Sequence, residues 1–300
     1  MPVVELAGVT KAYENKVAVS NLSLSIDAGQ MFGLLGPNGA GKTSSIRMMM
    51  GITVPDSGRV SLFGKPFERV SLERVGYLPE ERGLYKKMKV QEQLVFFGQL
   101  HGLTAEEARR RAIAWAERME IADALVKKTD ELSKGMQQKI QLIATLLHDP
   151  GLIVMDEPFS GLDPVNAKLL EKTLLELKDQ GKAIVFSTHR MDQVEKLCDS
   201  ICLIDKGVAV LTGTMREIKS RYERNHVVVE FEGSAEFLNS TEIAEAKNFS
   251  GHAEIRLKPH GNAQKLLQEA SAGATIYRYE LVAPSLEEIF IWTVGGKADA

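Results

Sequence analysis

Long apolar runs are missing from this chain of 300 residues. The strongest, LIVM at 152–155 and AIVF at 183–186, are far shorter than the roughly 20 residues that a membrane-spanning helix needs. We therefore expect no membrane-spanning segment. The first residues, MPVVELAG, do not combine a basic segment with a long apolar stretch, so we also expect a protein that is not exported.

Cysteine is equally scarce. Cys198 and Cys202 are the only two, and no second pair or neighbouring histidine accompanies them. A structural zinc site needs more ligands than this pair supplies, so the spacing does not indicate one. We expect both residues as reduced thiols in packed segments.

An excess of either charge is also absent. The chain has 37 basic and 40 acidic residues, which is a formal net charge of −3. A polyanion such as DNA or RNA would meet no overall attractive field, and this disfavours nonspecific nucleic-acid binding. Any phosphate-binding site must then be local.

The residues that are present fit two folded domains. Hydrophobic residues make up 44% of the chain and charged residues 26%, which is typical of globular proteins. We predict an α/β domain over residues 1–224, interrupted by a helical insert at about 90–147, where no strand pattern occurs. The predicted strands of this domain are residues 3–6, 31–35, 60–63, 152–155, 183–187 and 201–204.

The charge balance changes after about Arg224. Residues 226–300 contain 11 acidic and 6 basic residues, whereas residues 1–225 contain 29 acidic and 31 basic residues. The tail alternates strand and helix patterns, and its last helix follows Pro284, with Ser285 and Glu288 at the spacing of a capping box. We predict a small C-terminal α+β domain over residues 225–300.

A glycine-rich segment follows one of the predicted strands. GPNGAGKT at 36–43 has the pattern G-x-x-x-x-G-K-[ST] and lies between the apolar run MFGLL and the helical pattern SSIRMMM. In that context the glycines allow backbone N–H groups to surround phosphates at a helix N-terminus. Lys42 is then expected to contact the β- and γ-phosphates of a nucleotide, and the Thr43 hydroxyl to bind Mg²⁺. The predicted nucleotide-binding residues of this segment are Gly36, Pro37, Asn38, Gly39, Ala40, Gly41, Lys42, Thr43 and Ser44.

A second segment, LIVMDEP at 152–158, predicts a buried strand that ends in two carboxylates. With the glycine-rich loop upstream, Asp156 is expected to hold Mg²⁺. Glu157 is expected to accept a proton from the water that attacks the γ-phosphate. Taken alone, the same pattern would also fit an exposed acidic strand end.

The order of these motifs and three others resembles the ATP-binding cassette (ABC) ATPases over about residues 3–222. LSKGMQQK at 132–139 is similar to the LSGGQ-type signature, SGLD at 160–163 to the D-loop, and His189 to the switch histidine. Tyr13 matches the aromatic residue that stacks on adenine. The resemblance implies a P-loop NTPase fold of the ABC type with a helical subdomain, ATP and Mg²⁺ as ligands, and His189 as a catalytic residue beside Glu157.

The resemblance also implies an active site that two subunits share. Ser133, Gly135 and Asp163 would contact the ATP bound by a second ATPase subunit, so the chain would pair head to tail with a copy of itself or with a related chain. Considered as residues alone, Ser133 and Asp163 could also be helix N-caps, and His189 could be structural.

Two positions depart from the family pattern. Lys134 and Met136 replace the glycine and the glutamine of the signature, and methionine cannot make the polar contacts of glutamine. In GYLPEERGLY, Glu80 stands where the family has the Q-loop glutamine, and its carboxylate would be an oxygen ligand for Mg²⁺. The neighbouring Glu81 fits the same position.

PEERGLY, LSKGM and the C-terminal domain most resemble the ATPase subunits of ABC-2-type bacterial exporters, in the branch of the sodium-efflux ATPase subunit. This resemblance implies an ATPase that powers a separate membrane permease from the cytoplasmic face of the membrane. Arg82, Lys86, Lys87 and Lys89 are either a solvated charged stretch or a contact with that permease or with lipid headgroups. The alternatives are a soluble ABC ATPase that acts on nucleic acid or ribosomes and a regulatory relative without ATP turnover. We expect no nucleic-acid partner, because the chain has one cassette and an acidic tail.

Overall fold

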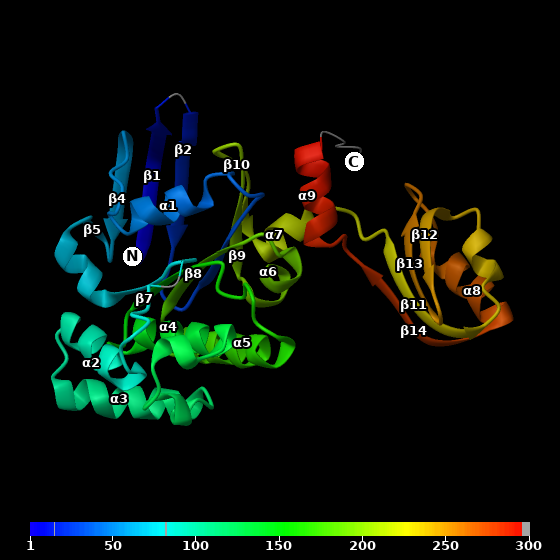
Figure 1. Ribbon diagram of the computed structural model, residues 1–300. Coiled ribbons are helices and arrows are strands. Elements are labelled where there is room, and N and C mark those ends of the chain that lie inside the picture. The colour runs from blue at the N-terminus through cyan, green and yellow to red at the C-terminus, as the bar shows by residue number, and fades with distance from the viewer. Residues whose placement is uncertain (15, 82, 296–300) are drawn as a thin grey trace. The chain divides into compact units, whose positions relative to one another are not determined.

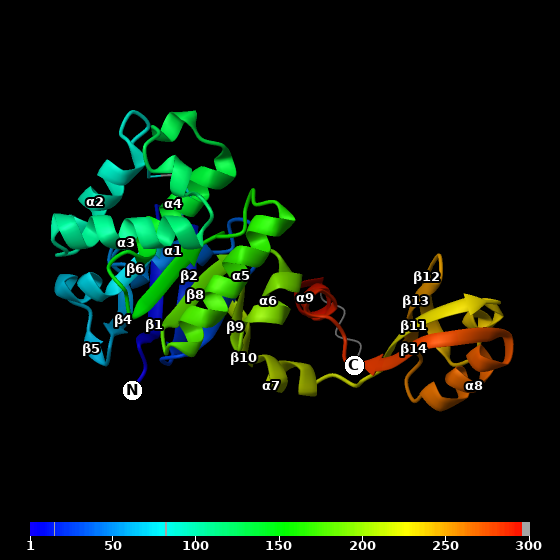
Figure 2. The same ribbon diagram turned by 90° about the horizontal axis from the view of Figure 1, so that it is seen from below.

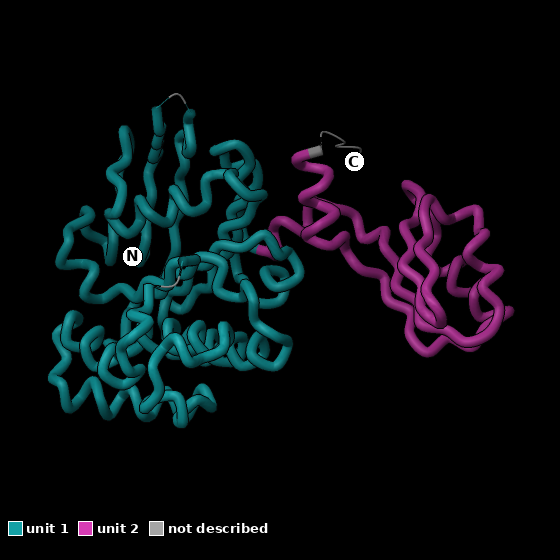
Figure 3. Tube along the Cα trace, viewed as in Figure 1, with its two compact units in different colours: residues 1–214 teal, residues 215–300 magenta. Residues whose placement is uncertain are grey.

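The computed structural model describes residues 1–14, 16–81 and 83–295 of the chain. The chain divides into two compact units, Met1–Thr214 and Met215–Ala300 (Figure 3). This division precedes residue 224, where the sequence placed the boundary, because the short helix α7 (Met215–Ser220) belongs to the second unit.

The first unit contains two sheets and six α-helices within its described residues (Figure 1). Its strands are β1 (Val4–Tyr13), β2 (Lys16–Ile26), β3 (Met31–Leu35), β4 (Ser57–Leu62), β5 (Lys65–Pro66), β6 (Val75–Leu78), β7 (Leu152–Asp156), β8 (Ala183–Thr188), β9 (Ser200–Asp205) and β10 (Val208–Thr214). Its helices are α1 (Lys42–Met49), α2 (Val90–Leu100), α3 (Ala105–Arg118), α4 (Lys134–Leu146), α5 (Pro164–Asp179) and α6 (Met191–Leu197).

The central sheet has the strand order β10-β9-β3-β8-β7-β6, and only β10 runs antiparallel to its neighbour among these described strands. Strands β3, β7 and β8 are buried along their whole length. Helices and the second sheet cover both faces of such strands, which explains why they are continuous apolar runs in the sequence. All three were predicted.

The second sheet is antiparallel and has the order β2-β1-β4-β5. Side chains of both sheets and of α1 share one core, which includes Leu6, Ile46 and Val154. Strands β2, β5, β6 and β10 were not predicted from the sequence. In β2 the apolar residues alternate with serines and asparagine, since one face of the strand is exposed.

Helices α2, α3 and α4 lie side by side and form a helical subdomain (Figures 1 and 2). The buried stripe of α3 consists of small residues, Ala108, Ala112 and Ala116. At Gly98 of α2, an added Cβ would lie 2.6 Å from the Ala108 Cβ. The backbones of the two helices therefore approach too closely for a larger side chain at this position. These helices fall within the range predicted for the insert.

The second unit is an antiparallel sheet covered by a helix, followed by a last helix. Besides α7 it contains β11 (His226–Gly233), β12 (Ile243–Phe249), β13 (His252–Leu257), α8 (Ala263–Gly273), β14 (Ala274–Val282) and α9 (Leu286–Gly295). The strand order is β12-β13-β11-β14, and the core joins Leu266 and Ala270 of α8 to Val227, Val229 and Ile255 of the sheet. Strand β12 was interpreted from the sequence only as a polar segment.

The last helix, α9, contacts the first residue of β11. Ser285 and Glu288 form the predicted capping box, with Ser285 N donating to Glu288 Oε2 at 2.8 Å and Glu288 N donating to Ser285 Oγ at 3.2 Å. His226 Nε2 lies 3.0 Å from Glu288 Oε1. The contact with His226, followed by the hydrogen bonds from Ser285, lowers the pKa of Glu288 to about 2.

Within the described part of the chain, no helix is both long enough and apolar enough to cross a membrane. Cys198 and Cys202 are buried free thiols, as expected.

Candidate functional site

The loop between β3 and α1 is built around glycines. Gly36 and Gly41 have φ angles of 147° and 115°, a region that residues with a side chain disfavour. A Cβ atom on Gly36 would lie 2.1 Å from the carbonyl oxygen of Ile204, and one on Gly41 would lie 2.4 Å from that of Ala18. The loop backbone is therefore pressed against β9 and β2, and the N-terminus of α1, where an anion is stabilised, opens beside it.

Lys42 is the first residue of α1 and is only 6% exposed. Its Nζ donates to the Gly36 carbonyl oxygen at 2.8 Å. Burial lowers the pKa of Lys42 below its ordinary value, whereas the nearby carboxylates of Glu157, Asp156 and Glu80 oppose this shift. One buried cation thus faces three carboxylates from two separate segments of the chain.

Two of these carboxylates lie at the carboxyl end of β7, where Asp156 is paired with Ser187 of β8. Ser187 is fully buried, and its Oγ donates to Asp156 Oδ1. The Glu157 N–H donates to the Ser187 carbonyl oxygen at 3.1 Å, and Glu157 has a φ of 50°. Successive residues of a regular strand point to opposite faces. The positive φ at Glu157 ends the strand and allows Asp156 and Glu157 to line the same cavity.

The side chain of Glu157 is held by the end of the neighbouring strand. Thr188 Oγ1 donates to Glu157 Oε2 at 3.2 Å, and His189 Nδ1 lies 2.9 Å from Glu157 Oε1. Thr188 is 1% exposed. Three consecutive residues, Ser187 to His189, therefore orient both carboxylates.

These residues surround a cavity of about 470 Å³, which is within the size range of small-molecule sites. The structure brings together most of the predicted site residues, although Gly36, Pro37 and Ala40 are not among the described lining residues. The cavity is lined by Tyr13, Lys16, Ala18, Asn38, Gly39, Gly41, Lys42, Thr43, Ser44, Glu80, Asp156, Glu157, Ser160 and His189.

Three predicted residues are not part of this cavity lining. Ser133 caps α4, with its Oγ accepting a hydrogen bond from Met136 N at 3.3 Å. Asp163 caps α5, and Gly135 lies in the first turn of α4. Ser133 and Asp163 are exposed, so the cap positions expected from the residues alone are occupied while both side chains remain accessible to another molecule.

Glu80 and Glu81, which both fit the Q-loop position in the sequence, differ in their surroundings. Glu80 lines the cavity. Glu81 is not among the described lining residues. Its backbone contacts α4, because Gln141 Nε2 donates to the carbonyl oxygens of Glu81 and Pro79, each at 3.1 Å. Gln141 therefore ties the helical subdomain to the loop that carries Glu80.

Sequence reasoning missed several residues of the site. Lys16 lies opposite Tyr13 in the β1–β2 hairpin, and Ser187 and Thr188 precede His189 at the end of β8. The sequence contained a signal for the last two, since pairing of the strands at 152–155 and 183–187 as parallel neighbours would bring the residues just before His189 beside Asp156 and Glu157.

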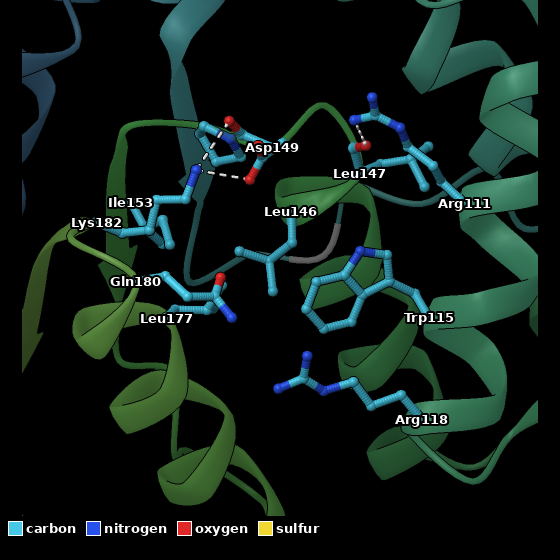
Figure 4. Close-up of a pocket in the computed structure, with 11 residues that line it drawn as sticks. Arg111, Trp115, Arg118, Leu146, Leu147, Asp149, Ile153, Leu177, Gln180 and Lys182 are labelled. Atoms are coloured by element: carbon cyan, nitrogen blue, oxygen red, sulfur yellow. Dashed lines mark hydrogen bonds and ion pairs between the residues drawn. The ribbon is translucent and has the colours of Figure 1, made fainter.

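A second cavity of about 240 Å³ lies between α3, the end of α4 and α5, and shares no described lining residue with the first (Figure 4). Trp115 and Leu146 point into it (Figure 4). Its basic side chains are already engaged: Arg111 Nη1 donates to the Leu147 carbonyl oxygen at 3.1 Å, Lys182 Nζ lies 2.6 Å from Asp149 Oδ1, and Arg118 pairs with Glu176. Because each of these side chains already has a partner, none of the described residues of the second cavity offers a phosphate an unpaired cation.

Comparison with known proteins places this geometry in a family. Residues 19–160 match the ABC transporter family, and residues 213–294 match the C-terminal domain of ATP-binding proteins like DrrA1-3. The ABC transporter ATP-binding protein YhaQ of Bacillus subtilis is 43% identical over 288 residues, which cover 96% of this chain and 97% of that protein. The Nod factor export ATP-binding protein I of a Rhizobium species is 31% identical, with 97% of each chain covered.

Among solved structures, an ATP-binding subunit of an ABC transporter has a TM-score of 0.69 and 29% identity, covering 73% of this chain and 92% of that one. The predicted resemblance and fold class are thereby confirmed. The relatives are named as transporter proteins, in agreement with the leading functional prediction rather than its alternatives. The chain belongs to the ATP-binding proteins of ABC transporters, the nucleotide-binding and ATP-hydrolysing subunits of that family.

Proposed function

We propose that this chain binds ATP together with Mg²⁺ in the cavity at the N-terminus of α1. The observation that carries the proposal is the convergence of Lys42, Asp156, Glu157 and His189 on that one cavity. A triphosphate would replace the carbonyl oxygens as the partner of Lys42 with stronger, charge-assisted hydrogen bonds.

The charges around the cavity also support Mg²⁺. Lys42 already faces three carboxylates, so a triphosphate entering without a further cation would meet net repulsion. Thr43, Asp156 and Glu80 carry the oxygen ligands that Mg²⁺ prefers. When bound, the ion would neutralise charge on the β- and γ-phosphates.

Glu157 is the proposed base for hydrolysis. It would accept a proton from water while the water oxygen bonds to the γ-phosphorus, and the bond from that phosphorus to the bridging oxygen breaks with its electron pair leaving on ADP. The 2.9 Å contact of His189 with Glu157 supports a role for His189 in orienting the base.

The proposed active unit is a head-to-tail dimer of ATPase subunits. Ser133, Gly135 and Asp163 lie outside the cavity lining of their own chain. The side chains of Ser133 and Asp163 are exposed. We place these three residues against the ATP of the second subunit.

We further propose that the dimer powers export through a membrane permease from the cytoplasmic side, as the name of the Nod factor export relative suggests. An exposed aromatic group supports a docking surface. Tyr85 is 53% exposed and packs with Phe96 and Phe97 at ring-centroid distances of 6.0 and 6.1 Å. Lys86 and Lys87 are exposed beside it, so this surface offers a partner an apolar centre with a charged rim. Arg82, expected in the same stretch, lies outside the described residues.

Two variants test the shared site. Glu157→Gln should bind MgATP, hydrolyse it poorly and accumulate as an ATP-bound dimer, because the charge of the carboxylate is removed and its shape is kept. Adding Ser133→Arg should return this protein to monomer at the same concentration, as followed by light scattering. A stable ATP-induced dimer that tolerates Ser133→Arg would exclude the signature segment from the interface and contradict the shared site.

A further inference from the structure

The strand that carries Tyr13 loses its sheet neighbour before it reaches Tyr13. The register between β1 and β4 ends where Thr10 is paired with Ser57. From there Asp56 takes the place of a strand: its N–H donates to the Thr10 carbonyl oxygen at 2.8 Å, and its Oδ2 accepts the Ala12 N–H at 2.7 Å. One carboxylate thus continues the hydrogen bonding of β1 towards Tyr13.

The other oxygen of the same carboxylate holds a lysine. Lys11 Nζ lies 2.6 Å from Asp56 Oδ1, and the Lys11 side chain is 17% exposed. The hydrogen bonds from Lys11 and then from the Ala12 N–H lower the pKa of Asp56. Asp56 therefore stays ionised and keeps the ammonium group in one place.

That ammonium group lies against the ring of Tyr13. Lys11 Nζ is 5.7 Å from the ring centroid, within the range of a cation–π interaction. Tyr13 lines the nucleotide cavity, whereas Lys11 is not among its described lining residues. Lys11 thus contacts the ring of a cavity-lining residue without being one of the described lining residues itself.

We propose that Lys11 and Asp56 are positioning residues that fix the Tyr13 ring as a platform for the nucleotide base. This inference rests on the proposed function, in which Tyr13 stacks on the base. Stacking needs only an aromatic face of the ligand, so the ion pair controls the share of nucleotide affinity that comes from the base and leaves the share from the phosphates unchanged.

Two ligands distinguish the contribution of the base to the affinity from that of the phosphates. MgATP contains base and phosphates, whereas inorganic tripolyphosphate with Mg²⁺ contains phosphates alone. Lys11→Met and Asp56→Asn should each weaken MgATP binding by about two- to five-fold and leave tripolyphosphate binding unchanged. Lys11→Arg, which keeps the cation, should restore the affinity for MgATP. Lys65→Met, on the exposed strand β5, is the control for removing a lysine.

Combined variants identify the route of the effect. Lys11→Met with Asp56→Asn should weaken MgATP binding no more than the stronger single change, because both act through one ion pair. In a Tyr13→Ala protein, neither change should weaken MgATP binding further, because its target is gone.

Three outcomes would count against the proposal. Equal losses for MgATP and tripolyphosphate would make the ion pair purely structural. Weak binding in Tyr13→Ala with normal binding in Lys11→Met and Asp56→Asn would overturn the positioning role and leave the proposed function intact. Normal MgATP affinity in Tyr13→Ala would remove the base platform itself and the inference with it.

Discussion

His189 Nδ1 lies 2.9 Å from Glu157 Oε1, although the two residues are 32 positions apart in the sequence. The contact exists because their strands, β7 and β8, are parallel neighbours whose carboxyl ends meet at one edge of the sheet. The same edge receives the glycine-rich loop after β3, so the residues proposed to bind phosphate and those proposed to activate water converge there.

We predict that His189→Ala lowers the turnover number for ATP hydrolysis by about 100-fold or more, with ATP affinity nearly unchanged, because the contact with Glu157 orients the proposed base. Steady-state ATPase assays and nucleotide titrations measure the two effects. Thr188→Val should lower turnover less, since it removes the bond to the other carboxylate oxygen, and Thr188→Ser should restore it. Full activity of His189→Ala would exclude the residue from the reaction.

Lys42→Ala should weaken MgATP binding by about 10- to 100-fold, because it removes charge-assisted bonds to phosphate, and hydrolysis should be lost. Circular dichroism should show an unchanged fold, since Lys42 bonds only its own loop among the described contacts. The exposed Lys65→Ala serves as the control. An Lys42→Ala protein that hydrolyses ATP as fast as the parent would refute the phosphate assignment.

A chain that ends at Thr214 should retain MgATP binding. All described lining residues of the cavity precede Arg190, and the chain divides after Thr214. Isothermal titration of the shortened and full-length proteins compares their affinities directly. Loss of binding in a shortened protein that still unfolds cooperatively would show that the second unit contributes to the site.

The helical subdomain should lose stability in mild acid. Burial, followed by repulsion from His101, lowers the pKa of His148 from 6.5 to about 4, and its ring stacks on that of His101 at 3.7 Å. The unfolded chain therefore binds a proton first, so stability should fall as pH decreases from about 6.5 towards 4. Because the ring is partly exposed, we expect a loss of about 1–2 kcal/mol.

Denaturant unfolding at several pH values measures this slope. His148→Gln should flatten it without abolishing it, because burial also lowers the pKa of His101. An equally steep slope in His148→Gln would assign the acid sensitivity to other groups.

The parts of the site that depend on local geometry could be predicted from the sequence. Gly36 and Gly41 must be glycines because of their own φ angles and the backbone beside them, and this requirement appears directly as a motif. The apolar strand before Asp156 was recognisable for the same reason, since burial on both faces leaves a continuous run.

Contacts between distant segments were not predictable in this way. Asp56 completes β1 and Gln141 holds the loop of Glu80, yet both are ordinary polar residues in unremarkable local sequence. Strand β6 was missed because a glycine interrupts its four residues. Strand β12 was missed because it is almost wholly exposed and so lacks the apolar pattern that marks a buried strand.

The pairing of Asp156 with Ser187 has a consequence for how the gene can change in length. One extra residue inside β7 or β8 would send every later side chain of that strand to the opposite face, and the carboxylates would separate from Thr188 and His189. Insertions in the turn between α5 and β8 leave this pairing untouched, since that turn lies at the far ends of both strands. Length variation among functional descendants of this sequence should therefore accumulate at the edge of the sheet away from the nucleotide, while the strand ends that face the nucleotide keep their residue count.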